Sequence, residues 1–142
     1  AKAYLSTAIV QWAAARHLEL DVVSLWEIQL ARQAGFPPER IHLHGNNKSD
    51  AELQAALAAG IGQVVCDNET ELRQLALFAA EAGRVQPVWL RLTPDVDVHT
   101  HEYRRTGRKD SKFGFGWPEA ERALAFLQRA SSLRLVGLHM HL

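Results

Sequence analysis

The sequence predicts an α/β fold, a partial (β/α)8 TIM barrel with about five consecutive βα repeats. Strand-like segments rich in Val, Ile and Leu alternate with alanine-rich helical segments. The first four strand-like segments are centred near residues 21, 42, 64 and 90, a cadence typical of parallel βα units. No glycine-rich phosphate loop follows the first strand, which disfavours an open doubly wound sheet. A complete barrel has eight repeats in roughly 250 residues, so we expect the 142 residues to be the middle of one, cut at both ends.

Local signals place each element in order. Strands are predicted at residues 18–24, 40–45, 62–67, 86–94 and 133–142. Helices are predicted at residues 7–17, 26–35, 49–60, 68–83 and 118–130. Ser49 precedes Glu52, and Asn68 precedes Glu71, by the three residues of a capping box. Pro118 is expected at the first position of the last helix, where its missing N–H costs nothing.

Composition excludes several classes of protein. Lys plus Arg equals Asp plus Glu at 16 each, so the chain lacks the basic excess of a nucleic-acid or membrane-surface binder. No apolar run is long enough to cross a membrane, and no signal peptide is visible. The single cysteine, Cys66, cannot form an intrachain disulfide, which favours a reducing, cytoplasmic setting.

Polar residues gather where the predicted strands end. In a βα barrel these carboxyl ends form one mouth, where ligand groups converge. The residues at these positions are Lys2, Asp21, Ser24, His44, Gly45, Asn46, Asp67, Arg91 and His141.

Two i, i+2 histidine pairs lie on predicted strands, and residues i and i+2 share a face. We expect Ile41 and Leu43 to face the helices and His42 and His44 to face the interior, with the same alternation for His139 and His141. Such pairs could ligate zinc, as in metal-dependent hydrolases, or contact an organic cofactor. A third pair, His99 and His101, falls in a predicted loop, which disfavours the metal interpretation.

The long loop at residues 99–116 carries a cluster of cations that suits either a solvated surface or a lid over an anionic ligand. Its ending, "SKFGFG", is apolar enough to dock on the barrel. The cations are Arg104, Arg105, Arg108, Lys109 and Lys112.

Lys2 is the sharpest catalytic candidate. A lysine in a partly desolvated pocket at a barrel strand end has a lowered pKa and becomes a nucleophile toward carbonyl groups. That is the requirement for a Schiff base with a substrate or with pyridoxal phosphate. A lysine this close to the start of a sequence can equally be an ordinary solvated side chain.

Seven stretches, in order along nearly the whole chain, resemble the barrel domain of the diaminopimelate decarboxylase family, pyridoxal-phosphate enzymes of the alanine racemase-like fold. The resemblance implies that Lys2 binds the cofactor covalently and that His141 stacks on its ring. It implies that Asp21 and Arg91 are polar groups of the cofactor site and that Lys112 lies near the active-site loop and dimer contact. The stretches are "KAYLSTAIVQWAA", "LDVVSLWEIQLA", "FPPERIHLHGNNKSDAEL", "VVCDNETEL", "VWLRLTP", "HTHEYRRTGRKDSKFGFG" and "LVGLHMHL".

The implied activity is decarboxylation of meso-2,6-diaminopimelate to L-lysine and carbon dioxide, in lysine biosynthesis. Alternatives are another basic amino-acid decarboxylase, of ornithine or arginine type, or a non-catalytic relative that binds pyridoxal phosphate. The resemblance implies a homodimer with a C-terminal β domain, so residues 1–142 would be an incomplete barrel domain that is inactive alone. Leu25 and Trp26 stand where the family usually has a glycine or two, and could alter the pocket or pack outward.

Overall fold

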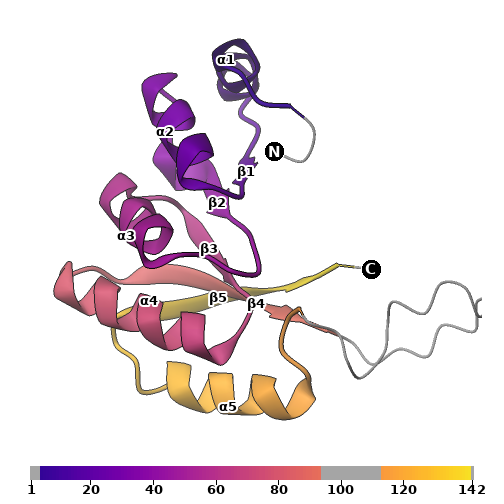
Figure 1. The fold of residues 1–142 in the computed structure, drawn as a ribbon, viewed down its shortest axis with the longest axis vertical. Helices are drawn as coiled ribbons and strands as arrows, with labels where there is room; N and C mark the ends of the chain where they lie inside the picture. The colour runs from indigo at the N-terminus through magenta and orange to yellow at the C-terminus, as the bar shows by residue number, and fades with distance from the viewer. Residues whose placement is uncertain (1–3, 94–112, 142) are drawn as a thin grey trace, which may run out of the picture.

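The computed structural model describes residues 4–93 and 113–141. In this part of the chain, five parallel strands form a sheet in the order β1-β2-β3-β4-β5, as the βα repetition predicts. The helices stack along one side of that sheet (Figure 1). The elements are α1 (Thr7–Ala15), β1 (Leu20–Val22), α2 (Leu25–Gln33), a 3-10 turn (Pro38–Arg40), β2 (Ile41–Leu43), α3 (Asp50–Ala59), β3 (Gln63–Cys66), α4 (Glu69–Glu81), β4 (Gln86–Leu92), α5 (Trp117–Leu127) and β5 (Leu133–Met140).

Helices α3 and α4 begin after the capping residues that the sequence indicates, Ser49 and Asn68. The Ser49 side chain accepts from the Glu52 N–H while the Glu52 carboxylate accepts from the Ser49 N–H, so α3 has a complete capping box. At its other end Gly60 takes the left-handed conformation, which glycine adopts without a steric penalty. Helix α5 begins at Trp117, so Pro118 is its second residue, not its first. None of the helices in the described ranges is long and apolar enough to cross a membrane.

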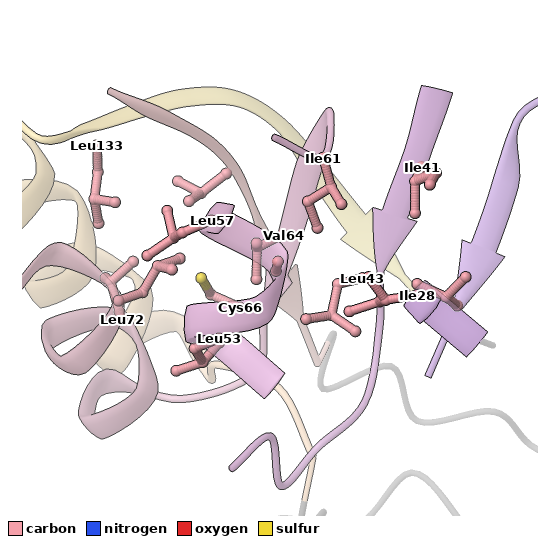
Figure 2. Packing of buried hydrophobic residues seen from close by; sticks show 14 of the residues in the cluster. Ile28, Ile41, Leu43, Leu53, Leu57, Ile61, Val64, Cys66, Leu72 and Leu133 are labelled. Atoms are coloured by element: carbon pink, nitrogen blue, oxygen red, sulfur yellow. The ribbon is translucent and has the colours of Figure 1, made fainter. Parts of the chain in front are cut away.

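The hydrophobic core fills the space between the helices and the sheet (Figure 2). Alternate residues of each strand enter it, including Ile41 and Leu43 of β2, as predicted. The strand residues between them point away from the helices, onto what we call the inner face of the sheet. The inner face carries Asp21, His42, Val65, Trp89 and Arg91.

Strand β5 changes its alternation at one irregularity. Leu133 pairs with Gln86 and Leu135 with Val88, but Gly137 is the residue that pairs with Trp89, so Val136 is extra. Beyond this bulge His139 pairs with Arg91, which places His139 on the inner face as predicted. Leu138 and Met140 pair with Leu90 and Leu92 on the helix side, and both are more than half exposed.

Candidate active site

The structure describes three of the four predicted site residues. Asp21 lies in β1, Arg91 lies in β4, and His141 follows the last residue of β5. All three are therefore at the carboxyl ends of parallel strands, where barrel sites form. Lys2 lies outside the described residues, as do Lys112, His99 and His101.

Asp21 joins the two histidines at the end of β2. Its Oδ1 lies 3.3 Å from His44 Nε2 and 3.7 Å from His42 Nδ1. The hydrogen bond from His44, aided by the charges of both histidines, holds the pKa of Asp21 below its usual value despite partial burial. His42 is 5% exposed, and its Nε2 lies 3.5 Å from Glu19 Oε2.

His44 also meets His139 across the inner face. Their rings lie edge to face, with centroids 5.0 Å apart and planes at 70°. Burial lowers the pKa of His139 below its usual value, and repulsion from His44 and Arg91 lowers it further. His139 Nδ1 is buried and has no hydrogen-bond partner among the described residues, so a polar ligand atom could satisfy it.

Arg91 is held by Asp67, the residue that follows β3. Arg91 Nη1 donates to Asp67 Oδ1 at 2.8 Å, and the Gly114 N–H donates to Asp67 Oδ2 at 3.1 Å. Phe115 is buried and pairs with Leu92, so this end of the predicted loop docks on the sheet as expected. One aspartate therefore fixes both a site cation and the start of the segment leading to α5.

A buried ion pair that the sequence analysis missed supports this mouth. Lys48 Nζ lies 2.8 Å from Glu71 Oε1 and donates to the carbonyl oxygens of Gly45 and Val65, each at 2.6 Å. The two charged side chains are 2% and 4% exposed. All three ammonium protons are satisfied, so Lys48 ties the loop after β2 to β3 and α4.

The predicted capping box of Asn68 and Glu71 is only half formed. The Asn68 side chain does accept from the Glu71 N–H, but the Glu71 carboxylate accepts from the Asp67 N–H and from Lys48 instead of closing a capping box. A signal was present: Glu71 is four residues before Leu75, a core residue on the same helix face. Burial raises the pKa of Glu71 above its usual value, against the opposing effect of Lys48.

Fold and site together define a domain of the βα-barrel class, with a histidine-rich polar site at the carboxyl ends of its strands. Residues 1–142 match the family model described as "Pyridoxal-dependent decarboxylase, pyridoxal binding domain". The chain belongs to this family.

Curated relatives and solved structures of similar sequence are diaminopimelate decarboxylases. The chain is 49% identical to the diaminopimelate decarboxylase of Mycobacterium leprae over 100% of the chain and 30% of that protein. It is 46% identical to that of Bacillus subtilis, over 99% of the chain and 33% of that protein. Diaminopimelate decarboxylase from Helicobacter pylori, complexed with L-lysine, superposes with a TM-score of 0.85 at 32% identity, over 96% of this chain and 35% of that chain. The chain thus spans about a third of the length of the relatives it matches.

Proposed function

We propose that the inner face at the carboxyl ends of β1 to β5 holds pyridoxal phosphate, and that the protein decarboxylates meso-2,6-diaminopimelate to L-lysine. The observation that carries the proposal is the continuous contact from Asp21 through His44 and His139 to Arg91 at one end of the sheet. The match of the whole chain to a pyridoxal-binding domain supports it, as does the 49% identity to a diaminopimelate decarboxylase.

The residues present suit an anionic, aromatic cofactor. Arg91 brings a positive charge to the site, and the imidazoles of His44 and His139 offer ring faces and ring nitrogens. The buried Nδ1 of His139 needs a partner that the described chain does not supply. In this proposal Lys2 binds the cofactor covalently, and His141 stacks on its ring. Asp21 and Arg91 border the site.

When bound, pyridoxal phosphate supplies an electron sink for the carbanion left by loss of carbon dioxide. The chain's contribution is to hold charges and rings in place. Asp67 fixes the guanidinium of Arg91, while Lys48 fixes the loop that carries His44. Both supports are almost fully buried, so the site is organised before any ligand arrives.

The proposal includes an amino-acid substrate and a homodimer. Three of the solved relatives at about 30% identity are complexed with L-lysine, the expected product. A lysine/ornithine decarboxylase from Vibrio vulnificus superposes with a TM-score of 0.67 at 24% identity, which shows a shared fold alone. The relatives therefore favour diaminopimelate over ornithine as the substrate.

The test uses the full-length protein. Pyridoxal phosphate is added, the adduct is reduced with borohydride, and the modified lysine is mapped by mass spectrometry. We expect modification at Lys2, its loss in Lys2→Ala, and carbon dioxide release from meso-diaminopimelate. An adduct at Lys2 with release from ornithine or arginine instead would overturn the substrate. No adduct, or an adduct at another lysine, would overturn the cofactor assignment.

A further inference from the structure

The inner faces of β1 and β2 carry a group of side chains with the composition of a metal site. Asp21, His42 and His44 each offer one ligand atom, and these atoms all lie within 4.8 Å of one another. Two imidazoles and one carboxylate form the donor set that zinc and its neighbours in the first transition row prefer. We propose that Asp21, His42 and His44 bind a divalent transition-metal ion of the zinc class when no cofactor fills the site.

The spacing of the ligand atoms fits such an ion. Zinc bonds to nitrogen and oxygen are about 2.0–2.2 Å long, so two ligands of a tetrahedral site lie roughly 3.3–3.6 Å apart. Asp21 Oδ1 is 3.3 Å from His44 Nε2 and 3.7 Å from His42 Nδ1. The ligand atoms that lie further apart, up to 4.8 Å, would have to move slightly toward the metal ion. The Asp21 side chain, which is 67% exposed, would make this movement.

A second carboxylate supports the proposed ligand set. His42 presents Nδ1 to Asp21 and Nε2 to Glu19, whose Oε2 lies 3.5 Å away. Histidines that ligate metals usually donate their second ring N–H to a carboxylate, which fixes the ring and makes the ligating nitrogen more basic. His42 Nε2 is buried and makes no hydrogen bond within the described residues at the present 3.5 Å distance, so Glu19 would give this support after a small approach. His42 is also almost fully buried, so its ring is already oriented.

The two carboxylates beside His42 and His44 lower the electrostatic cost of binding a cation at this end of the site. Asp21 and Glu19 bring two carboxylates to a pair of imidazoles that are neutral when they ligate. Arg91, the cation near the end of β4, is already paired with Asp67. Solvent reaches the group through the exposed Asp21, so water can complete the coordination shell.

The experiment measures metal binding by the cofactor-free, full-length protein. Zn²⁺ is titrated calorimetrically, and Co²⁺ serves as the spectroscopic probe because a low-symmetry site gives it a visible absorption band. We expect one-to-one binding, with affinity reduced at least tenfold in Asp21→Asn and in His44→Gln. Glu19→Gln should weaken it by up to about tenfold, as expected for a carboxylate behind a ligand. The matched control is His17→Asn, which removes an exposed imidazole just after α1.

Binding that persists at full affinity in both ligand variants, or no binding at all, would overturn the proposal. If His44→Gln fails to fold, which circular dichroism would show, Asp21→Asn carries the test alone, because this exposed residue changes only one atom. The measurement needs no pyridoxal phosphate and no turnover. Its result therefore stands whether or not borohydride traps a cofactor on Lys2.

Discussion

The imidazole rings of His44 and His139 lie 5.0 Å apart although two strands, β3 and β4, separate β2 from β5 in the sheet. Neighbouring strands are about 4.8 Å apart, so in a flat sheet β2 and β5 would be roughly 14 Å apart. The contact therefore requires the sheet to curl toward its inner face. The same curl closes barrels, which agrees with the superposition on diaminopimelate decarboxylase structures.

The buried pair of Lys48 and Glu71 gives the first prediction. Lys48→Met leaves a carboxylate buried without its cation, so we expect the free energy of unfolding to fall by about 3–5 kcal/mol. Adding Glu71→Leu removes that carboxylate and should recover part of the loss. A deficit of about 1–3 kcal/mol should remain, from the two carbonyls that lose Lys48 and the Asp67 N–H that loses Glu71. Urea unfolding of both variants measures the difference.

The matched control is Arg73, whose exposed guanidinium lies 3.8 Å from Glu69 on the same helix. Arg73→Ala, which also removes a cation–π contact with Phe126, should change stability by no more than about 1 kcal/mol. A pH series adds a second check. Burial raises the pKa of Glu71 in the folded state, and a raised pKa gives stability that is present at acidic pH and lost as pH rises through it. The cost of Lys48→Met should therefore shrink as pH falls; an equal cost at all pH values would contradict this account.

Asp67→Asn should loosen the segment that leads to α5. The Gly114 N–H donates to a carboxylate oxygen of Asp67, and hydrogen bonds to charged groups contribute about 1.5–3 kcal/mol. We expect amide exchange at Gly114 to accelerate by about tenfold or more, measured by hydrogen exchange. The amide of Phe115, which donates to the backbone oxygen of Arg91, is the internal control and should change less. Unchanged protection at Gly114 would show that the carboxylate does not hold this segment.

The pKa of His139 should rise in His44→Asn. Burial lowers this pKa, and the charge on His44 lowers it further, so removing His44 removes one of the opposing charges. An NMR titration of the histidine ring protons measures the shift, with His17→Asn as the variant that should leave His139 unchanged. Because the folded-state pKa is lowered, the stability linked to His139 is lost as pH falls through its unfolded and then its folded value. A fall in the pKa of His139 in this variant would show that His44 does not lower that pKa.

Cys66 should be inert in the folded protein. It is fully buried in the core between the sheet and the helices, and burial raises the pKa of its thiol far above the usual value (Figure 2). Because the thiolate is the reactive form, we expect no alkylation of Cys66 by iodoacetamide in buffer and complete alkylation in urea. Peptide mapping by mass spectrometry identifies the residue. Modification in buffer at the rate seen in urea would mean that the core opens readily.

Much of the fold was predictable because its signals are local. The capping box at Ser49 and the alternation in "RIHLHG" each depend on a few neighbouring residues, and both were confirmed. From the sequence, Trp26 could either alter the pocket or pack outward. In the structure its side chain is 63% exposed.

The missed features depend on distant segments. Whether Glu71 caps its own helix or meets Lys48 is decided by how the loop after β2 packs on α4. The contact between His44 and His139 depends on the curvature of the whole sheet. Neither quantity can be read from a window of neighbouring residues. The roles of Lys2 and His141 remain predictions.

The bulge at Val136 changes which residues of β5 face the helices and which face the inner side of the sheet. In a regular strand, odd-numbered and even-numbered residues face opposite sides of the sheet. One extra residue exchanges the two sets: beyond Val136 the odd-numbered residues lie on the inner face. Leu133 and Leu135 count as helix-side residues before the bulge, and an unbroken count would send His139 to that side as well. The inserted residue resets the count, and His139 meets His44 instead. Deleting Val136 removes the bulge together with the extra residue, so Gly137 still follows Leu135 on the opposite face and His139 should keep its orientation.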